Sequence, residues 1–199
     1  MTRGHLSGAI PPSLFSSLPH LTHLMLYANN ISSALPSEVG LASNIQVLKL
    51  ENNFMTGALV SELGLLTHLE ELTIGDNDFW RSLPSELGQL TKLTSLSLEN
   101  NRFSGTVPSF LESLTLLERF SLAHNLMTGS IPVALGALTN MRDLNLATLG
   151  VTGTVPSFLG QLTLLGTPTL LLMLLLPFAA PTVSHPHNQC CLHLYQQIP

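Results

Sequence analysis

The sequence predicts an α/β repeat solenoid in which short parallel strands stack into one continuous sheet, and the reason is a strict internal period. An asparagine returns with a 24-residue period, at Asn29, Asn53, Asn77, Asn101 and Asn125. Leucine-like residues keep this step before the asparagine, and a Gly-x-Val/Ile-Pro element keeps it afterwards. Agreement over six consecutive units is typical of repeats that bury their apolar faces only against neighbouring copies.

Each unit carries a Leu-x-Leu alternation shortly before the asparagine. An alternation of this kind predicts a short strand with one face in the core and the other in solvent. The core-facing pairs are Leu24 and Leu26, Leu48 and Leu50, Leu72 and Ile74, Leu96 and Leu98, Phe120 and Leu122, and Leu144 and Leu146.

The asparagine stands where the chain turns away from the predicted strand. Its side-chain amide can bond backbone groups that the turn leaves unpaired, so the repeated asparagines predict a ladder along the stack. Leu149 occupies the sixth position of this series. We therefore expect the ladder to end at Asn125.

The period also predicts the domain boundaries. Residues 1–166 form the repeat array, with a partial copy at 6–11 before six full units. At Pro168, one full period after Leu144, a proline occupies a core position and cannot donate the amide that a central strand needs. Residues 167–199 are expected to form an irregular or helical tail, apolar at first and then containing histidine and cysteine.

The best-formed unit spans residues 89–108 and reads QLTKLTSLSLENNRFSGTVP. It resembles the leucine-rich-repeat family, and its Leu-Gly and Gly-x-Ile-Pro elements are similar to the plant-type class over residues 6–165. This resemblance implies a parallel sheet on a concave face, with short extended segments or turns on the outer side, in the manner of receptor-like ectodomains. The paired-cysteine cap of secreted members and a recognisable C-terminal cap are both missing, so we expect a fragment with exposed core at its ends.

Composition excludes several classes of function. With seven Lys and Arg residues and a net charge of −5, the chain lacks the basic face that nucleic acids require. No catalytic motif and no cofactor-binding motif is recognisable, so we expect no enzyme activity and no cofactor. A cluster in the tail contains zinc-preferring side chains, but its adjacent cysteines do not fit a structural site, and we predict no metal: His185, His187, Cys190, Cys191 and His193.

Residues that alternate with the inward leucines define the candidate binding surface. They favour a protein or peptide partner, and their central acidic members Glu51, Glu71, Asp76 and Glu99 favour one with exposed Lys or Arg. For any single residue, a solvated sheet face is the simpler interpretation. The candidate residues are Tyr27, Lys49, Glu51, Glu71, Thr73, Asp76, Ser97, Glu99, Arg119, His124, Asp143 and Asn145.

One further stretch, Phe79-Trp80-Arg81, combines residue types that are common in binding hot spots. The sequence favours a loop variation there. Elsewhere Glu112 replaces a glycine that recurs at this position, and drift in an outer loop is the expected explanation.

The predicted function is a protein or peptide recognition module resembling a receptor-like ectodomain, with a soluble enzyme inhibitor or an intracellular scaffold as alternatives. The class resemblance implies the cell surface or the extracellular space, whereas the absence of an apolar stretch at the N-terminus leaves a cytoplasmic location open. A membrane tether through residues 164–180 is marginal, because Pro168 and Pro177 bracket an apolar run shorter than a span of about 20 residues. The run could equally cover the open end of the solenoid or be unselected sequence.

Overall fold

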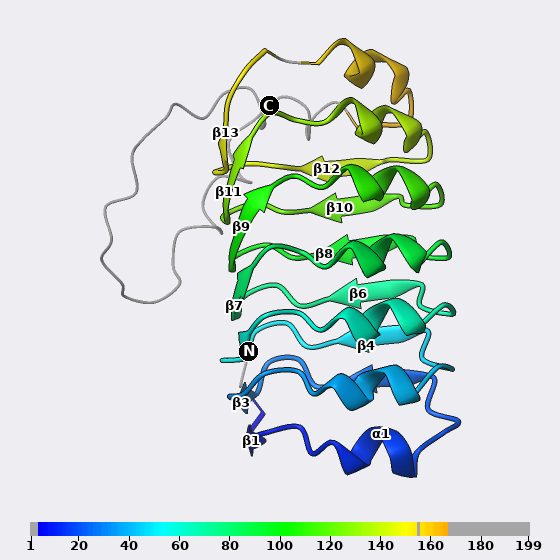
Figure 1. The fold of residues 1–199 in the computed structure, drawn as a ribbon, viewed down its shortest axis with the longest axis vertical. Helices are drawn as coiled ribbons and strands as arrows, with labels where there is room; N and C mark the ends of the chain where they lie inside the picture. The colour runs from blue at the N-terminus through cyan, green and yellow to red at the C-terminus, as the bar shows by residue number, and fades with distance from the viewer. Residues whose placement is uncertain (1–3, 155, 167–199) are drawn as a thin grey trace, which may run out of the picture.

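The computed structural model describes residues 4–154 and 156–166, which form a single column of stacked repeats (Figure 1). One side of the column is a six-stranded parallel sheet, which we call the inner sheet. Equivalent residues of consecutive units are partners in it, as in Leu24 with Leu48 and Leu72 with Leu96. The predicted parallel sheet is confirmed. Its strands are β2 (His23–Met25), β4 (Val47–Lys49), β6 (Glu71–Thr73), β8 (Ser95–Ser97), β10 (Arg119–Ser121) and β12 (Asp143–Asn145).

A second set of parallel strands follows the asparagines, and we call it the lateral sheet. The sequence analysis did not predict it. At the N-terminal end of the column, β1 (Ser7–Gly8) pairs with β3 (Asn30–Ile31). The other members are β5 (Thr56–Gly57), β7 (Asp78–Arg81), β9 (Arg102–Thr106), β11 (Leu126–Gly129) and β13 (Gly150–Val151).

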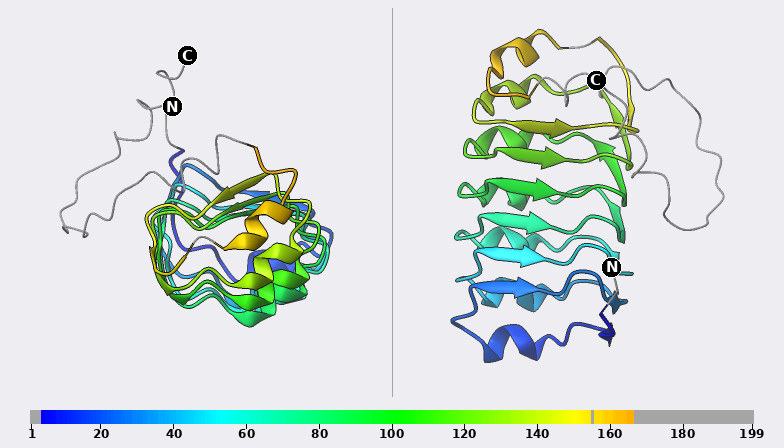
Figure 2. Two further views of the ribbon diagram at one scale, coloured as in Figure 1. Left: turned by 90° about the horizontal axis from the view of Figure 1, so that it is seen from above. Right: turned by 180° about the vertical axis from the view of Figure 1, so that it is seen from behind.

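The outer side is helical, which corrects the expectation of extended segments or turns. One α-helix and six short 3-10 helices stack along it, each 3-10 helix beginning after an extended proline or, in one unit, after Val60. Seen along the column, helices and strands close around a central core (Figure 2). The helices are α1 (Ser13–Ser17), η1 (Ser37–Leu41), η2 (Ser61–Leu65), η3 (Ser85–Gln89), η4 (Ser109–Ser113), η5 (Val133–Ala137) and η6 (Ser157–Gln161).

Rows of equivalent apolar side chains fill the core. In the middle units the inward leucines of the inner sheet are fully buried, as Leu48, Leu72 and Leu98 illustrate. Under the lateral sheet, the rings of Phe79 and Phe103 stack in parallel with their centroids 6.2 Å apart. Both faces of each unit therefore contribute to one continuous apolar interior.

The asparagine ladder joins the two sheets and confirms the sequence prediction. In the middle of the column, Asn101 donates from Nδ2 to the carbonyl oxygens of Ile74 and Leu98, at 3.0 and 3.2 Å. Its Oδ1 accepts from the backbone amide of Phe79 at 3.0 Å. The same pattern recurs at Asn53, Asn77 and Asn125, all of which are buried. Each asparagine thus satisfies backbone groups of the inner strand that it follows and of the adjacent lateral strand.

The first described unit is more open than the middle ones. Leu6 and Leu18 are 57% and 44% exposed, whereas Leu48 and Leu72 have no exposed surface. The predicted tail at residues 167–199 lies outside the described residues, and so do the tail's cysteines and histidines.

Candidate binding surface

All of the predicted site residues lie on the solvent side of the inner sheet or at the turn that ends it. Tyr27, Arg119, His124 and Asp143 are exposed, and the other eight predicted residues are half-buried. Ser95, which the alternation also assigns to the solvent face, is instead buried with 6% of its surface exposed. The structure therefore brings the predicted residues onto one continuous surface; their role in binding stays a prediction.

Contacts between neighbouring strands hold the central side chains in place. Lys49 Nζ lies 2.8 Å from Glu71 Oε1. The Thr73 hydroxyl donates to Glu51 Oε2 at 2.5 Å, and the Ser121 hydroxyl donates to Glu99 Oε2 at 2.6 Å. Because each partner comes from the next strand, stacking of the units orients these carboxylates.

In the middle of the inner surface, three carboxylates have no ion-pair partner among the described residues and form what we call the acidic row: Glu51, Asp76 and Glu99. Glu71, which the sequence analysis grouped with them, is instead paired with Lys49, so its charge is balanced. Gly75 lies between Glu51 and Glu99 in the repeat frame, and a Cβ there would come within 3.1 Å of Glu99 Cγ. Gly75 therefore leaves its backbone uncovered by a side chain between the carboxylates of Glu51 and Glu99.

Asp76 is the residue of the acidic row that the surroundings perturb most clearly. Burial raises the pKa of its carboxyl, and the negative charge of Glu99 raises this pKa further. The hydrogen bond from Asn100 lowers the pKa, Glu51 raises it and His124 lowers it. The electrostatic influence of Glu51, Glu99 and His124 on Asp76 shows that side chains from four units share one local field.

A left-handed backbone corner ends each inner strand, and the sequence analysis missed it. The residues immediately before the ladder position have φ values between 52° and 58°. Asn52, Asp76 and Asn100 belong to this series, and Asn and Asp tolerate the left-handed region better than most residues, which was the available signal. Asp76 and His124 therefore occupy the rim between the two sheets instead of the flat strand. The full series is Ala28, Asn52, Asp76, Asn100, His124 and Thr148.

Beside β10 and β12, Glu118 forms ion pairs with the predicted residue Arg119 and with Arg142, and the sequence analysis selected neither Glu118 nor Arg142. Glu118 Oε2 lies 3.3 Å from Arg142 Nε and 4.0 Å from Arg119 Nη1. These groups are substantially exposed, so each pair contributes little to stability. Their effect is to balance the charge at this end of the inner surface, which leaves the middle as its acidic part.

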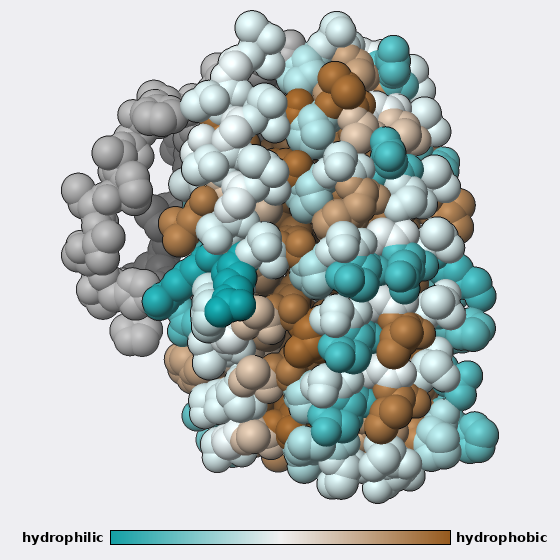
Figure 3. Space-filling model, viewed as in Figure 1, coloured by the Kyte–Doolittle hydropathy of each residue, from teal (hydrophilic) through white to brown (hydrophobic). Residues whose placement is uncertain are grey.

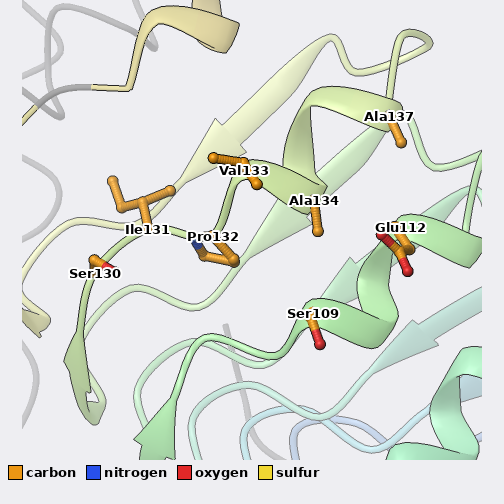
Figure 4. A pocket seen from close by; sticks show the side chains of 8 residues that line it. All are labelled: Ser109, Glu112, Ser130, Ile131, Pro132, Val133, Ala134 and Ala137. Atoms are coloured by element: carbon orange, nitrogen blue, oxygen red, sulfur yellow. The ribbon is translucent and has the colours of Figure 1, made fainter.

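The outer side has a shallow open depression between η4 and η5 (Figure 4). It is lined by Glu112, which occupies the recurrent glycine position, and by the small residues Ala134 and Ala137. At the equivalent Gly64, a Cβ would lie 2.6 Å from the carbonyl oxygen of Glu86. The Glu112 side chain lines this depression beside Ala134 of the facing unit, whereas a side chain at Gly64 would meet the backbone of the next unit.

Neither metal-binding nor membrane-spanning features are found in the part of the chain that the structure describes. No three side chains of His, Cys, Asp or Glu come together there in a way that could hold a metal ion. No helix within residues 4–154 and 156–166 has the length and apolarity needed to cross a membrane.

The inner sheet, the asparagine ladder and the helical outer side define a leucine-rich-repeat solenoid. The leucine rich repeat family model matches residues 91–148. Together with the solved structures described next, this match supports a leucine-rich-repeat protein of the plant type. A comparison with curated protein sequences finds no match.

Several solved structures share the fold. The Arabidopsis receptor kinase HAESA, in complex with the peptide hormone IDA and the co-receptor SERK1, is 36% identical, with a TM-score of 0.79 over 81% of this chain and 27% of that one. The PEPR1–AtPEP1 structure is 34% identical, with a TM-score of 0.79 over 81% of this chain and 23% of that one. A plant ice-binding protein, 22% identical with a TM-score of 0.66 over 73% and 55% of the two chains, shares the fold alone. The chain spans about a quarter of the length of the two receptors.

Proposed function

We propose that this chain is a recognition module that binds a protein or peptide on the inner sheet, with the acidic row receiving a Lys or Arg side chain of the partner. The observation that carries this proposal is the group of three carboxylates, Glu51, Asp76 and Glu99, in the middle of a polar sheet surface. The HAESA structure, a complex with the peptide hormone IDA, and the PEPR1–AtPEP1 structure support a peptide or protein as the class of ligand.

The geometry favours recognition through oriented charges. Glu51 and Glu99 each accept a hydrogen bond from a hydroxyl of the next strand, so less side-chain entropy is lost when a partner binds. The raised pKa of Asp76 indicates that its negative charge is poorly compensated within the folded chain. A basic group from a partner would offset the repulsion between Asp76 and Glu99. Charge complementarity of this kind increases association rate and specificity.

The test is a selection of random displayed peptides on the full chain, followed by affinity measurement with the triple variant Glu51→Gln, Asp76→Asn and Glu99→Gln. This variant removes three negative charges and keeps side chains that can form hydrogen bonds. We expect selected peptides rich in Lys or Arg and an affinity loss of about tenfold or more at low salt, because the lost contacts are charged.

A matched control exists on the outer side of the column. Glu38, Glu62 and Glu86 occupy equivalent positions in η1, η2 and η3, and their change to Gln alters the net charge by the same amount. Binding should be unchanged in this control. Equal losses in the two triple variants would show that only the overall charge matters, and no loss in the first would remove the inner sheet as the site.

We further propose that the module acts at the cell surface or outside the cell. The ectodomain structures it resembles support this location, and in the glycosylation sequence Asn30-Ile31-Ser32 both Asn30, in β3, and Ser32, directly after it, are exposed. Expression through a secretory pathway should give a species that shifts on glycosidase treatment, and Asn30→Gln should abolish the shift. A tagged chain that stays in the cytosol of its native cells would contradict this location.

A further inference from the structure

We infer that the lateral sheet carries a second, separate docking surface, built around Trp80 and Arg81, for a protein that presents a carboxylate next to apolar side chains. This surface lies outside the inner sheet and does not depend on the proposed function. We call it the lateral patch and define it by Phe54, Asp78, Trp80, Arg81, Arg102 and Leu126.

The centre of the lateral patch is a pre-ordered arginine. The guanidinium carbon of Arg81 lies 4.9 Å from the centroid of the Trp80 ring, in a cation–π arrangement. No carboxylate lies within ion-pair distance of Arg81 anywhere in residues 4–154 and 156–166. Stacking restricts the guanidinium while its N–H groups stay available at the edges of its plane, which is the geometry that binds a carboxylate with two parallel hydrogen bonds.

The backbone at Arg81 is strained in a way that its counterparts avoid. Gly57, Gly105, Gly129 and Gly153 occupy this corner in other units with φ between 85° and 103°, and Arg81 adopts φ 72°. A bulky residue in this region costs free energy, and such strain is concentrated at functional sites. The position before it is similarly exceptional, because Trp80 replaces the small Thr56, Ser104 and Thr128 of other units.

The surroundings make this pair part of a larger surface. In the lateral sheet Trp80 is the register partner of Arg102, which pairs with Asp78 at 2.8 Å. Phe54 and Leu126 occupy the positions equivalent to Asp78 and Arg102 in the preceding and following units. They therefore continue the line of side chains that Asp78 and Arg102 form along the column, one on each side. Trp80 is 42% exposed, Phe54 44% and Leu126 57%. Figure 3 shows the strongest hydrophilic colour of this face over β7 and β9, next to apolar groups.

Charge and shape decide what kind of partner fits. Asp78 balances the charge of Arg102, so the lateral patch has a net charge of +1 (two arginines minus one aspartate). The whole chain has a net charge of −5. An acidic group is therefore the complementary ligand for Arg81. The exposed Phe54 and Leu126 side chains favour aliphatic or aromatic contacts beside that acid, which a protein supplies and a saccharide does not. Exposed Trp and Arg are also the residue types most enriched in protein-binding hot spots.

Selection of displayed random peptides on the full chain, with the triple variant of the acidic row as selection target, directs binding away from the inner sheet. We expect enriched peptides with Asp or Glu next to Leu, Ile or Phe. Trp80 is the only tryptophan in the sequence, so its fluorescence reports occupancy of the lateral patch directly. An acidic oligosaccharide, oligogalacturonate, serves as the second probe.

The matched variants are Arg81→Gly and Trp80→Ser, which install residues already present in neighbouring units and should leave the chain folded. We expect each to weaken the selected peptides by at least about tenfold. Selected peptides should bind equally to the triple variant of the acidic row and to the unmodified chain. Peptides that bind both matched variants unchanged, or a fluorescence response to oligogalacturonate alone, would overturn the proposal; so would a selection without binders.

Discussion

The inner and lateral sheets follow the same 24-residue period but place different demands on their corner residues. The corner that ends each inner strand has φ between 52° and 58°, and six different units fill it with Ala, Asn, Asp, His or Thr. In the lateral sheet the corner reaches φ between 84° and 103° at five glycines. Residues with a side chain can adopt φ between 52° and 58° at modest cost in free energy, whereas the larger φ values of the lateral corner are adopted almost only by glycine. The inner rim is therefore free to vary in chemistry, whereas the left-handed lateral corner is filled by glycine except at Arg81; Ser33, at the same repeat position, does not adopt a positive φ.

The largest expected effect tests whether the lateral sheet contributes to the core as strongly as the inner one. Phe103→Ala removes a fully buried ring that stacks on Phe79, and should lower the free energy of unfolding by about 3–5 kcal/mol. Leu98→Ala, on the inner side of the same unit, should cost about 2–5 kcal/mol. Urea unfolding followed by circular dichroism measures both. A much smaller loss for Phe103→Ala would mean that the lateral side packs loosely.

The next effect tests the connection between the two sheets. Asn101→Ala removes hydrogen bonds to the carbonyl groups of Ile74 and Leu98 and leaves the Phe79 amide without its acceptor. Since an unsatisfied buried group costs about 1–3 kcal/mol, we expect a total loss of about 3 kcal/mol. Asn29→Ala is the comparison and should cost less, because the hydrogen bonds of Asn29 are only partly buried, although the residue itself is as buried as Asn101. Equal losses would show that burial does not govern the strength of the ladder.

A smaller effect tests the two corners directly. Gly129→Ala places a Cβ at φ 85° and 3.1 Å from Thr106 Cγ2, so we expect a loss of about 1–2 kcal/mol. Arg81→Gly relieves the strain and loses the Trp80 contact, with a net gain of about 0.5–1 kcal/mol. Asn52→Gly, at the inner corner, should change stability by less than about 0.5 kcal/mol. Thermal unfolding midpoints rank the three; a destabilised Arg81→Gly variant would mean that the stacked pair stabilises the fold.

The smallest effect concerns pH at the inner corner. Because the folded-state pKa of Asp76 lies above its unfolded value, the folded chain binds more protons between these values and becomes less stable as pH rises through them. Asp76→Asn should therefore stabilise the chain at pH 7 by about 0.5 kcal/mol or less. The free energy of unfolding of the variant and of the unmodified chain is measured from pH 7 downward. The difference between them should shrink as the pH falls through the raised pKa of Asp76. An advantage independent of pH would show that the corner's backbone preference for Asn is the cause.

Much of the inner sheet could be predicted from the sequence. The Leu-x-Leu alternation determined which side chains enter the core, and the asparagine spacing predicted the ladder, because both depend on contacts between identical positions of adjacent units. The acidic grouping was only partly predicted. Glu71 and Lys49 belong to different units and to different positions of the repeat, and their pairing depends on which side chains meet across two strands.

The lateral sheet was not predictable in the same way. Its strands are as short as two residues, and the stretches after the asparagines mix buried residues such as Phe79 with exposed ones such as Trp80. A pattern of this length does not distinguish a strand from a loop. Trp80 and Arg81 were noticed as a hot-spot composition, but the cation–π contact and the left-handed backbone at Arg81 required the three-dimensional structure.

What the sequence determined by itself was the period, and with it the inner register: partners in the inner sheet are separated by one full period, as Leu48 and Leu72 are. Only the tertiary structure decided the lateral register, where partners such as Trp80 and Arg102 are closer in the sequence than one period. The difference from the period is even, so the same side chains face solvent, but it changes which of them are neighbours. The period gives only the number of residues per unit. The register of a strand pair depends on the direction in which each strand crosses the column, and the packing of the units sets that direction.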